Sequence, residues 1–258
     1  MKLKDRVAFI TGSSGGIGRE IALAFAAEGA HMGLAARNMG KLNALAEEVR
    51  KLGRKAIVCR CDVMKNEDIV NAVRATVKAL GPIDILVNSA GTFTLGEFQV
   101  MTDEQWHTIL QTNLTAPFVA IREVLPSMIE RKKGRIINIG SNSSKEGRPT
   151  AAIYAASKHG LLGLTKSLAA QVAPLGITAN TICPGFVATD MLEKSKQLRI
   201  AASGKSREEV TEELLNRIPT KRFVDPKEIA PLAVYLASDE SPSMTGQSIN
   251  IVGGAIMY

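Results

Sequence analysis

The 258-residue chain lacks the features that define several large classes of protein. No stretch approaches the ~20 consecutive apolar residues that a membrane-spanning helix needs, and the first residues, Met-Lys-Leu-Lys-Asp, do not form the apolar segment of a secretory signal. The three cysteines, at positions 59, 61 and 183, show no CxxC or other metal-ligand spacing. We therefore expect a cytoplasmic protein with reduced thiols, no membrane association and no metal site.

Aromatic residues and clustered charges are also scarce. Aromatic side chains make up 4% of the chain, and the 32 Lys and Arg that outnumber 25 Asp and Glu are scattered along it, for a net charge of +7. A nucleic-acid surface typically gathers its cations on one face and often adds aromatic stacking platforms. We therefore expect no nucleic-acid partner.

What the chain does contain is a regular alternation of strand and helix patterns. Apolar residues make up 45% of the sequence, enough for a core on both faces of a sheet, and no Pro/Gly/Ser-rich linker divides the chain. This alternation predicts one α/β domain with a doubly wound parallel sheet, helices on both faces, and a ligand site at the carboxyl ends of the strands. The expected strands are 6–10, 31–36, 56–60, 83–87, 134–139, 177–182 and 247–251, six of them followed by helical stretches.

A glycine-rich segment follows the first expected strand. Residues 11–18 read Thr-Gly-Ser-Ser-Gly-Gly-Ile-Gly, and a helical pattern begins directly after them. Glycines let a backbone approach a pyrophosphate closely, and the N-terminus of the next helix offers free N–H groups. A glycine-rich hairpin is the alternative, but the flanking strand and helix favour a dinucleotide site. The expected cofactor contacts here are Gly12, Ser14, Gly15, Gly16, Ile17 and Gly18.

Tyr154 and Lys158 lie four residues apart in an alanine-rich segment that is typical of a helix. Residues at this spacing share a helix face, so both polar ends can reach one site. A phenol normally titrates near ~10, and a neighbouring ammonium would lower that pKa toward the range useful for proton transfer. The same spacing also occurs on solvated helices, so the pair gains meaning only from other segments.

Taken together, these segments resemble the short-chain dehydrogenase/reductases. The resemblance covers essentially the whole chain and implies a Rossmann-type sheet of about seven strands. The matching landmarks, in the family's order, are Thr-Gly-x3-Gly-x-Gly at 11–18, Asp62 after the third strand, Asn-Ser-Ala-Gly at 88–91 in place of Asn-Asn-Ala-Gly, Asn113, Ser141 thirteen residues before Tyr154, Lys158, and Pro184-Gly185 with Thr189.

The resemblance implies roles for four catalytic residues. Tyr154 would exchange a proton with the substrate oxygen, Ser141 would stabilise that oxygen, and Lys158 would lower the pKa of Tyr154 and contact the nicotinamide ribose. Asn113 would hold a water that connects Lys158 to solvent, although it could instead be a structural amide in a kinked helix. The remaining cofactor contacts expected from the family are Asp62, Val63, Asn88, Ala90, Gly91, Tyr154, Lys158, Pro184, Gly185, Val187 and Thr189.

The second expected strand indicates which nicotinamide is used. Members specific for NAD place an acid at its end, whereas here Ala36 is followed by Arg37 and Asn38. A guanidinium suits a 2′-phosphate, so we expect NADP(H), with Arg37 and Asn38 as phosphate contacts. The alternative is that Arg37 is only a solvated loop charge.

The substrate is less defined by the sequence. The segments 144–147, 183–187 and 246–254 are similar to those of ketoreductases acting on 3-oxoacyl thioesters, so we expect a ketone or secondary alcohol of that type. Leu175 before Gly-Ile departs from the arginine common in fatty-synthesis reductases. A small polar alcohol, a sugar or an alicyclic ketone is the alternative substrate, and a non-catalytic dinucleotide-sensing binder is the least favoured function.

Two further expectations concern a lid and assembly. The segment 189–222 is expected to be irregular and to form a substrate lid, whose Lys and Arg residues either receive an acidic carrier or coenzyme A phosphate or form a solvated face. Family members assemble through two long helices, expected here at 102–131 and 152–174. We therefore expect a homo-oligomer, a tetramer before a dimer, with Leu161, Leu164 and Leu168 either at that interface or packed on the sheet.

Overall fold

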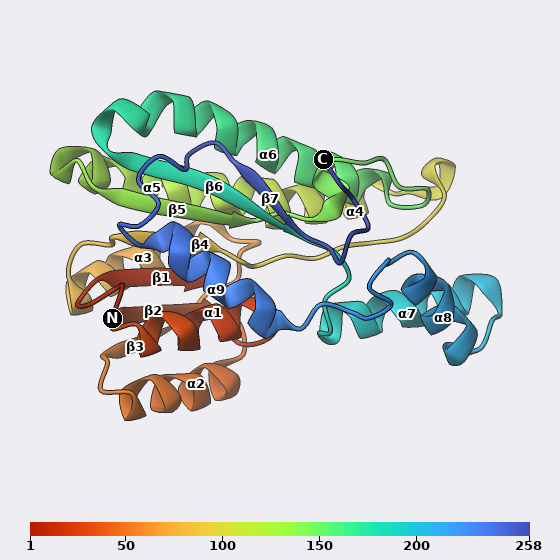
Figure 1. Cartoon of the computed structure of the whole chain (residues 1–258), viewed down its shortest axis with the longest axis horizontal. Coiled ribbons are helices and arrows are strands. Elements are labelled where there is room, and N and C mark those ends of the chain that lie inside the picture. Colours follow the sequence, from red (N-terminus) through yellow and green to blue (C-terminus); the bar gives the residue numbers. More distant parts are fainter.

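A seven-stranded parallel sheet forms the centre of the protein (Figure 1). The computed structural model describes residues 1–258. The strand order is β3-β2-β1-β4-β5-β6-β7, and each expected strand is found within two residues of its predicted ends. The strands are β1 (Val7–Thr11), β2 (His31–Ala36), β3 (Ala56–Arg60), β4 (Ile85–Asn88), β5 (Gly134–Ile139), β6 (Ile177–Pro184) and β7 (Ser248–Ile251).

Helices cover both faces of the sheet (Figure 1). Successive side chains of β1 belong to opposite cores: Phe9 packs in one buried cluster and Ile10 in the other. A strand buried on both faces is apolar throughout, which explains why β1 appears in the sequence as a continuous apolar run. One face carries α1 (Gly16–Ala27), α2 (Met39–Lys51) and α9 (Pro226–Ala237), and the other carries α3 (Asn66–Leu80), α5 (Ala116–Arg131) and α6 (Ala152–Val172).

The long helix expected at 102–131 is interrupted. It consists of α4 (Asp103–Leu110), one π-helical turn (Gln111–Thr115) and α5. Thr102 and Gln105 form a capping box that starts α4. The π turn matters for the site because it contains Asn113.

The segment 189–222 is not irregular as expected. It contains α7 (Asp190–Ser203) and α8 (Arg207–Asn216), which project together from the body (Figure 1). Leu192, Val210 and Leu214 form a small buried cluster of their own, separate from the two sheet cores.

Two smaller expectations can be compared with the packing. Leu168 of α6 belongs to the core on one face of the sheet and Leu164 packs against that core, so both face the sheet. Leu161 is also buried. All three cysteines are buried and free. None of the helices combines the length and apolar character that crossing a bilayer requires.

Candidate active site

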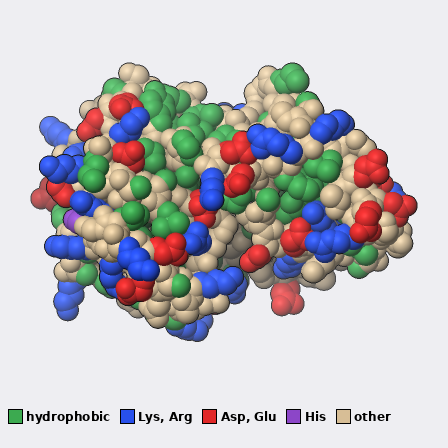
Figure 2. Space-filling model, turned by 60° about the horizontal axis from the view of Figure 1, so that its bottom comes forward, with side chains coloured by type: hydrophobic (Ala, Val, Ile, Leu, Met, Phe, Trp, Pro, Cys, Tyr) green, Lys and Arg blue, Asp and Glu red, His purple; other side chains and the backbone are tan.

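A cavity of about 660 Å³ opens at the carboxyl ends of the strands, between the sheet and the α7–α8 lobe. Figure 2 shows the surface hollowed where this lobe, on the right, meets the larger part of the molecule. Ligands of doubly wound sheets bind at this edge, beside the point where the strand order reverses. Among the expected site residues, those that line the cavity are Ile17, Gly91, Ser141, Tyr154, Lys158, Pro184, Gly185, Val187 and Thr189.

Ser141 is presented to the cavity by the turn that follows β5. Its Oγ accepts a hydrogen bond from the Ser143 backbone N–H at 3.1 Å and donates to Asn142 Oδ1 at 3.1 Å. Ser144 instead uses its Oγ to accept the Ser141 backbone N–H at 3.1 Å, and its side chain is buried beneath the turn. Ser141 and Ser144 therefore have different contacts, and Ser144 caps the turn.

The Tyr154 phenol lies deep in the cavity. Its ring meets the edge of Phe93, with centroids 6.3 Å apart and the planes at 79°. Burial raises the pKa of Tyr154, because a phenolate loses solvation there, and the Ser141 hydroxyl acts in the opposite direction by hydrogen bonding. The phenol is therefore protonated at neutral pH.

Lys158 is buried on the same face of α6. Its Nζ donates to the Ile139 carbonyl at 2.7 Å and lies 5.8 Å from the centroid of the Tyr154 ring. Burial lowers the pKa of Lys158 to about 8. Desolvation is the largest influence on the pKa of Tyr154, and the Lys158 ammonium is directed at the Ile139 carbonyl. The expected lowering of the pKa of Tyr154 by Lys158 stays a prediction.

The side chain of Asn113 is fully engaged. Its Oδ1 accepts from the Thr92 N–H at 3.0 Å, and its Nδ2 donates to the Thr92 carbonyl at 2.9 Å and to Ser157 Oγ at 3.0 Å. Ser157 in turn donates to the Tyr154 carbonyl at 2.7 Å. This amide therefore ties the loop after β4 to the turn that carries Tyr154. These contacts support the structural reading of Asn113, and its water-holding role stays a prediction.

The glycine turn after β1 fits a dinucleotide pyrophosphate. Gly12 has φ +70°, and a Cβ there would lie 2.7 Å from the Ala90 backbone, so the turn packs tightly on the loop after β4. At Gly15 a Cβ would meet nothing within 4 Å, and no side chain caps the N-terminus of α1. The N-terminus of α1 therefore has no side-chain cap and has open space at Gly15, both of which suit an anion there.

The expected adenosine side of the site lies on the edge formed by β2 and β3. Arg37, directly after β2, is exposed and makes neither an ion pair nor a hydrogen bond. Asn38 Oδ1 accepts from the Lys41 N–H at 3.0 Å as the N-cap of α2, which leaves its amide N–H groups free. Asp62 Oδ1 accepts from the Met64 N–H at 3.1 Å, and the Val63 carbonyl accepts from Gln111 at 3.1 Å.

A row of buried polar side chains lies beneath the site. Of its members, only Asn88 is among the residues expected from the sequence. Asn88 lies beside Asn138 in the sheet and donates to its Oδ1 at 2.8 Å, and Asn138 donates to Thr165 Oγ1 at 2.9 Å. Thr181 on β6 donates to the same Thr165 oxygen at 3.1 Å. The sequence does contain an indication of this row, because each of the apolar strands β4, β5 and β6 includes a polar residue. The row fixes β4, β5 and β6 to α6, and thus positions the turn of Tyr154.

Several cavity residues were also missed because they lie in loops without a motif. Phe93 and Leu95 follow β4, Arg148 follows β5, and Arg217 follows α8. Nothing in the local sequence indicates that these loops converge.

Comparisons with known proteins agree with this geometry. Residues 6–199 match the short chain dehydrogenase family. The protein assigned as ketoacyl reductase 1 of the granaticin polyketide synthase of Streptomyces violaceoruber is 40% identical over 254 residues, covering 98% of this chain and 93% of its own. A crystal structure of a single-substitution variant of actinorhodin polyketide ketoreductase with NADPH aligns with a TM-score of 0.94 at 38% identity, covering 98% of both chains.

A third similar protein is named for a different substrate and cofactor. The crystal structure of NAD⁺-bound xylitol dehydrogenase aligns with a TM-score of 0.94 at 30% identity and covers 98% of this chain and 100% of its own. The resemblance and the doubly wound fold predicted from the sequence are thus confirmed. By its family match and the extent of these similarities, the chain belongs to the short-chain dehydrogenase family of oxidoreductases.

Proposed function

We propose that this protein is an NADP(H)-dependent ketoreductase that reduces a ketone of the 3-oxoacyl type to a secondary alcohol. The observation that carries the proposal is the presence of Ser141, Tyr154 and Lys158 in one cavity that reaches the glycine turn at Ile17. The similarity to proteins named as ketoacyl reductases, and to one crystallised with NADPH, supports both the substrate class and the cofactor.

The residues divide the chemistry among them. A bound reduced nicotinamide supplies the hydride that the carbonyl carbon accepts. Tyr154 gives its phenolic proton to the carbonyl oxygen, and Ser141 donates a hydrogen bond that stabilises the charge developing there. Because burial keeps the phenol protonated at neutral pH, the free site is set for reduction rather than for alcohol oxidation.

Lys158 contributes a positive charge that is held in place next to Tyr154. Its ammonium is held by the Ile139 carbonyl at the end of β5, just before Ser141 in the chain. The positive charge beneath the Tyr154 ring stabilises the phenolate that remains after proton transfer. By stabilising the phenolate, the same charge favours release of the phenolic proton to the substrate oxygen.

The α7–α8 lobe is the proposed substrate lid of this single domain. Thr189, at the N-terminus of α7, packs on Gly16 of the glycine turn, and Nζ of Lys194 in α7 lies 6.0 Å from the Phe93 ring centroid. The lobe therefore contacts both the cofactor turn and the substrate wall, as a closed lid does.

The proposed assembly is a homo-oligomer, and a tetramer is favoured over a dimer. Large apolar side chains stay exposed on and just before one of the helices expected to form the interface: Trp106 and Phe118 are each 44% exposed, and Phe98, in the turn before α4, is 79% exposed. Light scattering that gives a monomer mass at micromolar concentration would overturn this assignment.

The function is tested by mixing the protein with NADPH and ketones and following loss of NADPH absorbance. We expect turnover of 3-oxoacyl thioesters. The similarity to xylitol dehydrogenase favours a polyol as the second candidate, which NAD⁺- or NADP⁺-dependent oxidation of sugar alcohols would reveal. Turnover of neither class, with cofactor binding intact, would favour a dinucleotide-sensing binder.

Arg37→Ala is expected to weaken NADPH binding about 10- to 100-fold and to leave NADH binding unchanged. The exposed, unpaired guanidinium at the end of β2 suits a charge-assisted bond to the 2′-phosphate, which NADH lacks. Fluorescence titration with both cofactors measures the effect. Lys51→Ala, which removes an exposed cation at the far end of α2, serves as the control. Equal affinities for NADH and NADPH in the unmodified protein would contradict the NADP(H) assignment.

A further inference from the structure

Three arginines line the same cavity as Tyr154. Arg148 comes from the loop after β5, whereas Arg199 lies in α7 and Arg217 ends α8. The first therefore belongs to the body and the other two to the α7–α8 lobe, so the guanidinium groups approach the cavity from two walls. No catalytic or cofactor role described above uses them.

Two of these three arginines, Arg199 and Arg217, lack an acidic partner within ion-pair distance. Arg199 is only partly exposed, and the sole side-chain hydrogen bond of its guanidinium is a long one from Nε to Ser195 Oγ, at 3.4 Å. Arg217 forms no ion pair, and only Arg148 has a carboxylate, Glu146 at 2.7 Å. Burial, together with the charges of Arg217 and Arg148, lowers the pKa of Arg199.

The nearby acids of the lobe are already paired with other cations. Glu213 pairs with Lys205, and Glu193 pairs with Lys196 and Arg207. The cavity therefore keeps an excess of positive charge on its substrate side, which costs free energy unless an anion enters.

We propose that Arg148, Arg199 and Arg217 form an anion-binding subsite that holds a carboxylate or phosphate carried by the ketone substrate. The inference rests on the proposed reductase function and narrows its substrate class. A guanidinium presents paired donors that match the oxygens of either group, and three of them on two walls can bridge body and lobe around one anion. Closing of the lid is then coupled to the charged end of the substrate.

The subsite also gives a reason for selectivity. A neutral ketone or a polyol that fills the cavity leaves Arg199 without a counter-charge, whereas an anionic ketone removes that cost. The apolar lining residues Phe93, Leu95 and Phe186 suit the carbon chain that joins the ketone to the charged end.

Two matched substrate pairs test the proposal. One pair is a long-chain oxo acid and its methyl ester, and the other is the 3-oxobutyryl thioester of phosphopantetheine and of pantetheine. We expect the charged member of at least one pair to have a kcat/KM about 10- to 100-fold higher, as for other charge-assisted bonds. The pair that shows the preference identifies whether carboxylate or phosphate is the natural anion.

Arg199→Gln should reduce that preference about tenfold, mainly by raising KM, with the neutral member changed by less than about threefold. Arg207→Gln, which removes an exposed guanidinium from the same lobe but outside the cavity, should leave both pairs unchanged. The proposal is overturned by reduction of both members of each pair with equal kcat/KM, or by an equal loss for charged and neutral members in Arg199→Gln.

Calorimetric titration with phosphopantetheine, pantetheine, a long-chain carboxylate and its methyl ester separates this proposal from the reductase function, because it needs no turnover. Stronger binding of the charged member of a pair, lost in Arg199→Gln, supports the subsite even if no ketone is reduced. Equal binding of charged and neutral members in both pairs overturns it, even if ketones are reduced.

Discussion

Tyr154→Phe should lower kcat for ketone reduction by about 10²- to 10⁴-fold, the range for loss of a positioned general acid. Phenylalanine keeps the ring that meets Phe93 and lies above Lys158, so only the proton donor is lost. The affinity for NADPH should therefore change by less than about threefold. Single-turnover kinetics and cofactor titration measure the two quantities separately.

Tyr235→Phe is the matched control, because it removes a hydroxyl from an exposed tyrosine of α9, outside the cavity. It should retain the activity of the unmodified protein. If Tyr154→Phe reduced ketones at an undiminished rate, the phenol would not be the proton donor.

The pH profile provides an independent measurement of the same group. Burial raises the pKa of Tyr154, so the protonated donor persists through neutral pH, while Lys158, with a pKa of about 8, loses its charge above that value. The rate of reduction should be level below about pH 8 and fall at higher pH, whereas oxidation of the alcohol should rise. A reduction rate that increases with pH would contradict these assignments.

The sequence was sufficient to predict the fold because local and global signals agree. Val7–Ile10 is apolar because β1 is buried on both faces, and Gly12 is needed after it because a Cβ there would strike the Ala90 backbone. The thirteen-residue interval selected Ser141 as the catalytic serine, which stays a prediction; the side chains of Ser141 and Ser144 have different contacts.

The parts that the sequence did not indicate depend on contacts between distant segments. The Ile139 carbonyl that holds Lys158 is a backbone group, which no residue type reveals. Arg148 and Arg217 lie in connections whose convergence on one cavity follows only from the folded chain. The α7–α8 helices were missed because their apolar positions bury a small separate core and not a face of the sheet.

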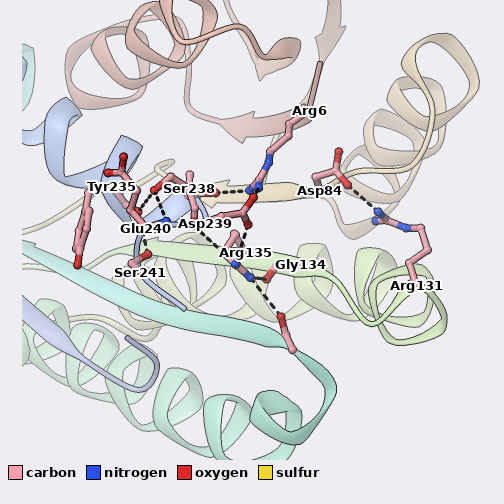
Figure 3. Close-up of polar contacts among 12 residues, drawn as sticks. Arg6, Asp84, Arg131, Gly134, Arg135, Tyr235, Ser238, Asp239, Glu240 and Ser241 are labelled. Atoms are coloured by element: carbon pink, nitrogen blue, oxygen red, sulfur yellow. Dashed lines mark hydrogen bonds and ion pairs between the residues drawn. The ribbon is translucent and has the colours of Figure 1, made fainter. Parts of the chain in front are cut away.

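A polar cluster at the amino ends of the strands, opposite the active site, is expected to contribute strongly to the free energy of unfolding. Arg6, before β1, and Arg135, in β5, are each 7% exposed and share the carboxylate of Asp239 (Figure 3). Arg6 also donates to the Ala237 carbonyl at 2.6 Å, at the end of α9, and Arg135 to the Ser238 carbonyl at 3.3 Å. One exposed acid thus neutralises two buried cations.

Asp239→Ala should lower the free energy of unfolding by about 2–3 kcal/mol, because it leaves two buried guanidinium groups without a counter-charge, with some screening by water on the acid's side. Glu240→Ala is the matched control: its partner Lys2 is 45% exposed, so the loss should be below about 1 kcal/mol. Urea unfolding at constant protein concentration measures both. Asp239, which is 75% exposed, should therefore contribute more to the free energy of unfolding than Glu240, which is 51% exposed.

The pH dependence distinguishes this charge effect from a packing defect. The hydrogen bond from Arg6 lowers the pKa of Asp239, so its contribution is complete above the unfolded carboxyl pKa of about 3.9 and is lost as the pH falls through the lowered value. The stability difference between the unmodified protein and Asp239→Ala should therefore be full at neutral pH and narrow in acid. A difference that stayed constant down to the acid unfolding transition, or equal losses in the two variants, would show that the buried arginines do not depend on Asp239.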